Sequence, residues 1–238
     1  MAAMFIGVGV GPGDPELMTV KAWRLIEQAE VISFISNEDG QSQAKTIAMP
    51  ALAGNKNILL EVPVCVPMIY DRVVVNKVYD QAAKEIQAQL NAGRTVVFIC
   101  EGDPLFFGSF AYLLERLQAK NICQVVPGIS SVHAASSALK EPLALLKESF
   151  AVVSGRHSEQ QLEAVLLAHD TVVIMKAGRS RLRILNALAA TRRTKDARYL
   201  EYIGRDSERV VTDVTQLEHQ SGPYFSLFVV IRQQRDQT

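Results

Sequence analysis

Residues 95–104 read Thr-Val-Val-Phe-Ile-Cys-Glu-Gly-Asp-Pro, an apolar run that passes directly into a turn. A short apolar run bounded by turn residues is typical of a strand buried on both faces in a parallel sheet. Similar runs occur at Met4–Val10 and Val31–Ile35, and helical patterns separate them. Strands that alternate with helices predict an α/β fold with a mostly parallel sheet. The other elements expected in this half are helices at Leu17–Ala29, Gln41–Met49, Arg72–Asn91 and Phe110–Gln118 and a strand at Cys123–Val126.

The pattern changes after residue 128. Three late strand patterns follow one another with no long helix between them, which favours antiparallel pairing. We therefore predict two α/β domains, residues 1–127 and residues 128–238. The elements expected in the second domain are helices at Ser130–Leu139, Glu159–Leu167 and Arg181–Ala190 and strands at Phe150–Ser154, Thr171–Met175, Ala197–Tyr202, Arg209–Thr212 and Phe225–Ile231.

The composition excludes several classes of protein. The chain has 238 residues, 48% hydrophobic and 21% charged, which is near the average for globular domains and excludes a disordered chain. Lys plus Arg and Asp plus Glu both number 25, and a zero net charge argues against a nucleic-acid binder. No apolar run approaches the roughly 18 residues that span a bilayer, and Met1–Gly7 lacks the basic start of a signal peptide. Three cysteines without a Cys-x-x-Cys pair predict a cytoplasmic protein with no disulfide and no metal site.

A glycine-rich loop follows the first strand. It reads Gly-Val-Gly-Val-Gly-Pro-Gly-Asp-Pro over residues 7–15. A dinucleotide fingerprint that starts at Gly7 would need its third glycine at position 12, where Pro12 stands, and no acidic residue closes the second strand. A nicotinamide-dependent oxidoreductase therefore stays only as an alternative from another class, and a tight turn without any ligand is the second alternative. Two more loops rich in glycine and proline, residues 101–104 and 127–131, end strands at the same expected edge, so we predict a pocket there.

Read in order, the three loops resemble the tetrapyrrole (corrin/porphyrin) methyltransferases. The resemblance rests on residues 9–15, on Glu-Gly-Asp-Pro-Leu-Phe-Phe-Gly-Ser-Phe at 101–110 and on Val-Val-Pro-Gly-Ile-Ser-Ser at 125–131. Within the family, the stretches 37–47, 79–83 and 223–226 look most like the precorrin-2 C-20 methyltransferases of cobalamin synthesis. The resemblance covers nearly the whole chain.

The family's known properties become expectations for this chain. The resemblance implies two α/β domains with a cofactor cleft between them, a homodimer, and S-adenosyl-L-methionine as the cofactor. It also implies which residues bind that cofactor. These are Pro12, Glu101, Gly102, Asp103, Phe106, Ser130, Ser131, Met175, Lys176, Tyr202, Pro223, Tyr224 and Phe225.

The same resemblance implies a reaction, the methylation of C-20 of precorrin-2 to give precorrin-3A. A cobalt-containing precorrin-2 is an open alternative, because the sequence does not separate the two substrates. Two departures from the family's common pattern matter. Glu101 stands where a glycine is common, and the second strand ends at Ser36 where related enzymes carry an aspartate proposed as a base. The catalytic base is therefore unknown.

Several other side chains are candidates for a role in binding or catalysis. Asp103 orients the cofactor or caps the turn before the next helix. Lys176 follows an apolar strand and is a candidate to bind substrate carboxylates, as are Arg156, Arg179, Arg181, Arg205 and Arg209. His157 is the best candidate among the histidines for handling a proton. Cys100 ends a buried strand, and a structural thiol is the favoured interpretation.

Overall fold

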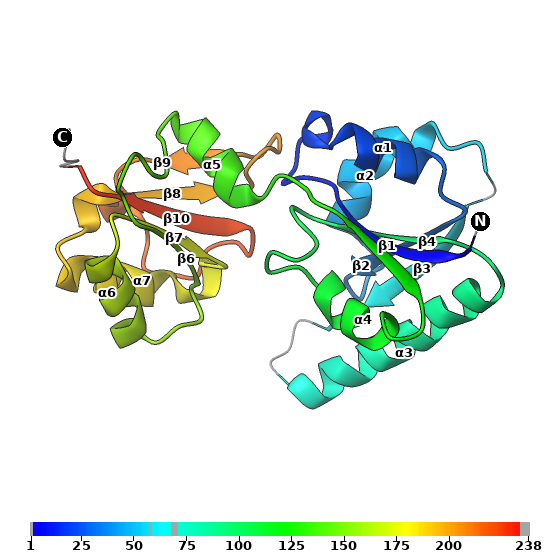
Figure 1. Ribbon diagram of the computed structural model, residues 1–238. Helices are drawn as coiled ribbons and strands as arrows, with labels where there is room; N and C mark the ends of the chain where they lie inside the picture. The colour runs from blue at the N-terminus through cyan, green and yellow to red at the C-terminus, as the bar shows by residue number, and fades with distance from the viewer. Residues whose placement is uncertain (1, 58, 68–70, 234–238) are drawn as a thin grey trace. The chain divides into compact units, whose positions relative to one another are not determined.

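The computed structural model describes residues 2–57, 59–67 and 71–233. The chain folds into two compact units, Met1–Ser131 and Val132–Thr238. Each unit has one sheet of five strands, shown in Figure 1.

The first unit contains an all-parallel sheet. Its strands are β1 (Met4–Gly9), β2 (Val31–Ser36), β3 (Leu60–Cys65), β4 (Val96–Cys100) and β5 (Ile122–Val126), in the order β3-β2-β4-β1-β5. Gly9 lies in register with Cys100 on one side, and Val8 lies in register with Val126 on the other. The carboxyl ends of β1, β4 and β5 therefore meet at one edge, as predicted for a parallel sheet.

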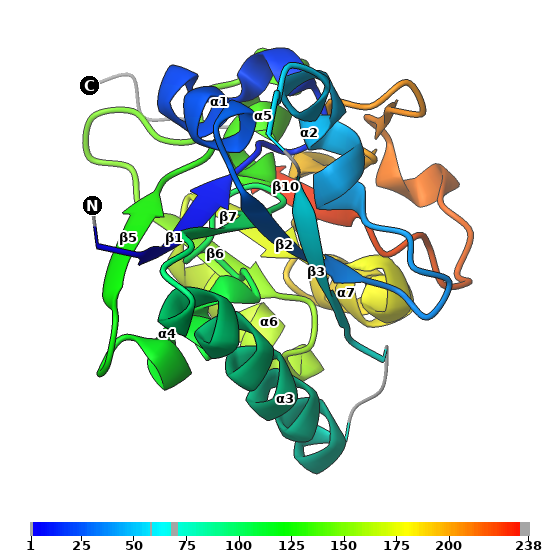
Figure 2. The ribbon, with the colours of Figure 1, turned by 90° about the vertical axis from the view of Figure 1, so that its right-hand side faces the viewer.

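Both faces of this sheet are covered by helices. In Figure 2, α1 (Val20–Glu27) and α2 (Gln43–Ala53) lie on one face and α3 (Arg72–Asn91) and α4 (Phe110–Leu117) on the other. Successive side chains of a strand point to opposite faces, so Phe5 packs with α3 and α4 while Ile6 packs with α1 and α2. Burial on both faces explains why the strands read as unbroken apolar runs.

Two features of the first unit differ from the sequence prediction. The strand β3 (Leu60–Cys65) was not predicted, because it contains Pro63, which cannot donate a backbone hydrogen bond to a neighbouring strand. A proline is tolerated there because β3 is an edge strand. The first helix begins at Val20 rather than Leu17, because Thr19 Oγ1 accepts a hydrogen bond from Ala22 N (3.1 Å) and caps the helix. Pro15–Leu17 forms a separate 3-10 turn, η1.

The second unit contains a mixed sheet. Its strands are β6 (Phe150–Ser154), β7 (Thr171–Met175), β8 (Ala197–Glu201), β9 (Arg209–Val211) and β10 (Ser226–Ile231), in the order β6-β7-β10-β8-β9. β6 and β7 are parallel, whereas β10 is antiparallel to β7 and β8, and β9 is antiparallel to β8. The predicted antiparallel pairing of the late strands is confirmed.

The mixed sheet also has a core on each face. One core includes side chains of α6 (Glu159–Ala168) and α7 (Arg181–Ala190), and the other includes those of α5 (Ser131–Leu139). In Figure 1 these helices lie on opposite sides of the strands. Three short 3-10 turns complete the unit, η2 (Gly178–Ser180), η3 (Thr194–Asp196) and η4 (Val214–Gln216).

Candidate functional site

Three loops of the first unit meet through their glycine backbones. A Cβ on Gly9 would lie 2.5 Å from the carbonyl oxygen of Gly102 and 2.6 Å from Cα of Gly128. A Cβ on Gly128 would overlap the same carbonyl oxygen. Gly102 N also donates to Gly11 O at 2.8 Å. The chain can cross itself this closely only where no side chain intervenes, so glycines at these positions bring the loops after β1, β4 and β5 together.

Asp103 ties two of these loops. Its Oδ1 accepts from Leu105 N (2.9 Å) within its own turn, and its Oδ2 accepts from Gly128 N (3.1 Å) in the loop after β5. The capping interpretation of Asp103 is therefore part of its structural role. A carboxylate has about four acceptor positions, and two are used by these bonds, so Asp103 keeps acceptor capacity for a ligand.

The remaining predicted residues of the first unit belong to the same three loops and differ in how far they are buried. Pro12 and Ser130 are buried, Glu101 and Ser131 are partly buried, and Phe106 is exposed, at 36%. Phe106 packs edge-on against Phe107, with 5.2 Å between the ring centroids. Phe107 has a positive φ of 56°, which is uncommon for a bulky side chain. The loop after β4 therefore presents aromatic surface beside carboxylate and hydroxyl groups.

Three segments of the second unit meet in a similar way at one end of the mixed sheet. Tyr202 N donates to Phe225 O at 2.9 Å, and Ala177 N donates to Ser226 O at 3.2 Å. A Cβ on Gly178 would overlap the carbonyl oxygen of Pro223. The end of β7, the turn after β8 and the loop before β10 are thereby joined by their backbones. They carry the predicted residues Met175, Lys176, Tyr202, Pro223, Tyr224 and Phe225.

Aromatic rings and the guanidinium of Arg205 lie together at this junction. The Phe225 ring lies 6.4 Å from Tyr202 and 5.1 Å from Tyr224, and Arg205 Cζ lies 4.0 Å from the centroid of Phe225. Tyr224 is 43% exposed. An exposed aromatic edge is suited to stacking with a flat ligand ring.

Lys176 and Tyr202 have a strained backbone. Their φ values are 56° and 52°, in the left-handed region that side chains other than glycine seldom adopt. Such strain persists only when the surroundings enforce it, and it is frequent at ligand sites. Burial lowers the pKa of Lys176, and the nearby charge of Arg156 lowers that pKa further. Two cations close to one another form a favourable environment for an anion.

The structure therefore groups the thirteen predicted cofactor residues by unit. Seven belong to the three glycine-joined loops of the first unit, and six belong to the junction in the second. Their roles toward a ligand remain predictions. The burial of Arg181 beside this junction was not predicted from the sequence, because an arginine at the start of an amphipathic helix has no distinguishing pattern.

Two other sequence candidates lie in ordinary structural surroundings. Cys100 is buried, and burial raises the pKa of its thiol, so the thiolate that would act as a nucleophile is disfavoured. His157 is exposed, and its Nδ1 lies 3.3 Å from Gln161 Oε1 at the start of α6. The proton-handling role of His157 stays a prediction.

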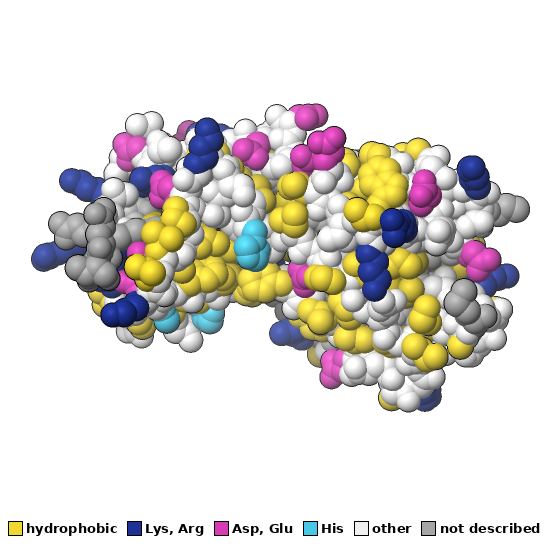
Figure 3. Space-filling model, turned by 45° about the horizontal axis from the view of Figure 1, so that its top comes forward, with side chains coloured by type: hydrophobic (Ala, Val, Ile, Leu, Met, Phe, Trp, Pro, Cys, Tyr) yellow, Lys and Arg dark blue, Asp and Glu magenta, His cyan; other side chains and the backbone are white. Residues whose placement is uncertain are grey.

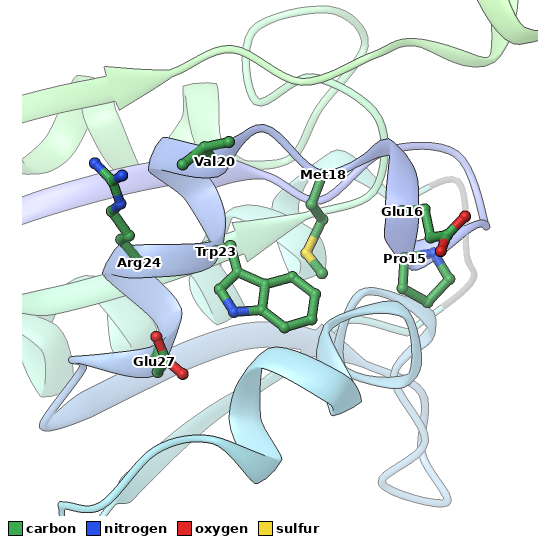
Figure 4. A pocket seen from close by; sticks show the side chains of 7 residues that line it. All are labelled: Pro15, Glu16, Met18, Val20, Trp23, Arg24 and Glu27. Atoms are coloured by element: carbon green, nitrogen blue, oxygen red, sulfur yellow. The ribbon is translucent and has the colours of Figure 1, made fainter.

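A hollow elsewhere in the first unit has a volume of about 400 Å³. Figure 4 shows Met18 and Trp23 directed toward the same space between η1 and α1. Trp23 is partly buried and packs against the core of the first unit. None of the predicted cofactor residues lines this hollow; its lining is Pro15, Glu16, Met18, Val20, Trp23, Arg24 and Glu27.

Basic and acidic side chains are mixed over the face drawn in Figure 3. Among residues 2–57, 59–67 and 71–233, no helix combines the length and apolar character needed to cross a bilayer. Over the same residues, no group of three or more His, Cys, Asp or Glu side chains is arranged to hold a metal ion.

Comparison with known proteins identifies the class. The family model of the Tetrapyrrole (Corrin/Porphyrin) Methylases matches residues 4–218. The chain belongs to this family, and the predicted family is confirmed.

Curated relatives cover most of the chain. The chain is 36% identical over 229 residues to cobalamin biosynthesis protein CobIJ of Mycobacterium tuberculosis, a match to 93% of this chain but 44% of the relative. The chain thus spans about half the length of that protein. It is 34% identical to a precorrin-2 C(20)-methyltransferase of Sinorhizobium, with 94% of both chains covered. It is 32% identical to the cobalt-precorrin-2 C(20)-methyltransferase of Salmonella typhimurium, with 79% of this chain and 80% of the relative covered.

Solved structures share the fold. Cobalt precorrin-4 methyltransferase CbiF superposes with a TM-score of 0.74 at 18% identity, covering 96% of this chain and 94% of the other. Uroporphyrin-III C-methyltransferase of Thermus thermophilus, complexed with S-adenyl homocysteine, has a TM-score of 0.65 at 23% identity over 97% of both chains. The predicted fold class, two α/β units of the tetrapyrrole methylase type, is confirmed.

Proposed function

We propose that this protein transfers a methyl group from S-adenosyl-L-methionine to C-20 of precorrin-2, giving precorrin-3A in cobalamin biosynthesis. The observation that carries the proposal is the 34% identity to a precorrin-2 C(20)-methyltransferase with 94% of both chains covered. The joined glycine loops of the first unit support the choice of cofactor.

The groups on these loops have the chemistry that the cofactor requires. The hydroxyl groups of a ribose need hydrogen-bond acceptors, and the carboxylates of Glu101 and Asp103 are such acceptors. The buried Ser130 adds a hydroxyl group of its own. An adenine ring needs an apolar or aromatic surface, which the exposed Phe106 supplies within the first unit. We propose that all thirteen predicted residues contact the cofactor.

The reaction does not require a side chain of the protein to act as a nucleophile. The sulfonium supplies an already activated methyl group. The protein has to hold this methyl group in line with the nucleophilic carbon, and positioning of this kind is worth on the order of 7–11 kcal/mol. Positive charge on sulfur disappears during transfer, so a water-poor site, which solvates the sulfonium less well, suits the reaction. Only a proton then has to leave the ring carbon, for which one weak base or a water molecule is enough.

The substrate carries many carboxylates and needs cations. Lys176 lies near Arg156, and Arg205 lies at the junction that holds Tyr202 and Phe225. We propose that these side chains bind carboxylates of the tetrapyrrole.

A second candidate substrate is the cobalt-containing precorrin-2. The 32% identity to the cobalt-precorrin-2 C(20)-methyltransferase of Salmonella typhimurium supports this substrate, and it is close to the 34% identity to the precorrin-2 enzyme. We further propose a homodimer, as the family resemblance implies. The change in strand pattern supports two domains divided near residue 128, and the cysteine content supports a cytoplasmic location.

The first experiment is calorimetric titration with S-adenosylhomocysteine, with NAD as the control ligand. We expect micromolar binding of the first and none of the second. Binding of NAD alone would replace the proposal with a nicotinamide-dependent oxidoreductase. An oxygen-free assay with precorrin-2 and its cobalt complex, analysed for a mass gain of one methyl group, then distinguishes the two substrates.

A further inference from the structure

Arg181 is buried in the second unit although it carries a permanent charge. It is the first residue of α7, and its side chain is 8% exposed. A cation at the N-terminus of a helix opposes the helix dipole, and burying an ion pair is often no better for stability than an apolar replacement. Stability alone therefore gives little reason for an arginine at this position, and its contacts indicate another role.

The guanidinium of Arg181 joins its helix to two strands. Its Nη2 donates to Tyr199 Oη (2.7 Å) and to Glu201 Oε1 (3.0 Å), both on β8. Its Cζ lies 4.7 Å from the centre of the Tyr199 ring. Arg209 Nη1 lies 3.7 Å from the other oxygen of Glu201, so the neighbouring β9 is included as well.

The same guanidinium packs against the loop before β10. A Cβ on Gly222 would overlap Arg181 Nη2 and lie 2.5 Å from Tyr199 Oη. Gly222 N donates to Gly178 O at 2.9 Å. The loop backbone is thus held between η2 on one side and the buried arginine and tyrosine on the other.

A hydrogen-bonded chain continues from the arginine into this loop. Burial raises the pKa of Tyr199, so its hydroxyl keeps its proton and can donate to Ser226, its other hydrogen-bond partner. Ser226 Oγ in turn donates to Pro223 O at 2.7 Å. Ser226 and Glu201 are register partners in the sheet, and Tyr202 follows Glu201 directly. The hydrogen-bonded network from Arg181 therefore reaches both the loop before β10 and the turn after β8, which carry predicted cofactor residues.

We propose that Arg181 is a positioning residue that fixes the loop 222–225 and the turn after Glu201 in the conformation that binds the cofactor. The loop-fixing part depends only on the contacts above, and the cofactor part rests on the proposed function. Arg181 acts through Tyr199 and Glu201 rather than by touching the ligand.

The matched control is a second buried arginine at the opposite end of the same sheet. Arg193 is 7% exposed and pairs with Asp196 through Nε at 2.5 Å. Its Nη1 and Nη2 donate to the carbonyl oxygens of Leu166, His169 and Asp170. Asp170 precedes the first residue of β7, whereas the Arg181 network lies where β7 and β8 end. Loss of Arg193 removes a comparable buried ion pair far along the strands from the loops.

The experiment compares wild type with R181M, R181K, Y199F and R193M. Amide hydrogen exchange is followed in peptides covering 202–208 and 221–226 without ligand, and S-adenosylhomocysteine affinity and thermal stability are measured in parallel. We expect faster exchange in both peptides for R181M and Y199F, and a rise in Kd of about tenfold for R181M, as loss of roughly one net hydrogen bond implies. R181K keeps the charge without the planar fork and should lie between R181M and wild type.

R193M should lower thermal stability while leaving loop exchange and Kd unchanged. Y199F removes a single oxygen, so it tests the network even if R181M does not fold. Unchanged loop exchange in Y199F, or an equal rise in Kd for R193M, would overturn the proposal. If wild type binds no S-adenosylhomocysteine, the proposed function fails, and the exchange data still decide whether Arg181 fixes the loops.

Discussion

Asp103 accepts a hydrogen bond from the backbone N–H of Gly128, at 3.1 Å, and so joins the loop after β4 to the loop after β5. The two residues are 25 positions apart in sequence. The adjacent parallel strands β4, β1 and β5 bring them to one edge of the sheet. The bond makes the shape of the candidate cofactor site depend on one carboxylate.

Asp103→Asn tests this dependence. The amide has one acceptor oxygen, so its NH₂ group must face one of the two N–H donors, Leu105 or Gly128. We expect the free energy of unfolding to fall by about 1–2 kcal/mol and the Kd for S-adenosylhomocysteine to rise about tenfold. Urea unfolding and calorimetry measure the two effects.

The control is Asp71→Asn, because Asp71 Oδ1 also accepts from two backbone N–H groups, those of Val73 and Val74. Asp71 caps α3 through one oxygen, which the amide of asparagine retains, so Asp71→Asn should change neither the stability nor the Kd appreciably. A wild-type Kd in Asp103→Asn would remove Asp103 from the site.

The glycine contact predicts a second effect. In Gly128→Ala the new methyl group overlaps the carbonyl oxygen of Gly102, so the loops must separate. We expect a loss of about 1–3 kcal/mol in the free energy of unfolding, as for overpacking, together with loss of S-adenosylhomocysteine binding. Gly40→Ala is the comparison, since Gly40 has a φ of 76° and no atom within 4 Å of the added Cβ. It should be strained but should still bind. Full binding by Gly128→Ala would show that the ligand does not need the joined loops.

The sequence predicted buried strands and the turns after them, but it did not predict features that depend on residues far away in the chain. Val96–Cys100 is buried on both faces, so its unbroken apolar run and the turn after it were recognisable. The strand β3 was missed because Pro63 argues against a strand except at a sheet edge, and edge position is a property of the whole sheet. The burial of Arg181 depends on Tyr199 and Glu201, which lie 18 and 20 residues away. A sequence pattern around Arg181 does not include residues so far away, so it cannot predict that Arg181 is buried.

Lys176 gives a prediction that separates substrate from cofactor. The charge of Arg156 is close enough to lower the pKa of Lys176, and a carboxylate-rich ligand should gain from both charges. In Lys176→Met we expect the Kd for a tetrapyrrole substrate to rise about tenfold, as loss of one charge-assisted contact implies, with a smaller change for S-adenosylhomocysteine. Lys120→Met, at an exposed position, is the control. The opposite order of effects would assign Lys176 to the cofactor alone.

The same lysine predicts a pH dependence of stability. Burial, and then the charge of Arg156, lower the pKa of Lys176 below its ordinary 10.5. Between the lowered pKa and 10.5 the unfolded chain binds more protons than the folded chain at this position, so the free energy of unfolding gains a contribution that increases with pH. Lys176→Met lacks that contribution. The difference between wild type and Lys176→Met should therefore shift in favour of wild type as the pH rises toward 10.5, as measured by urea unfolding at several pH values. Lys120→Met should track wild type over the same range, and a parallel response of Lys176→Met and wild type would mean that the folded protein does not disfavour the charged lysine.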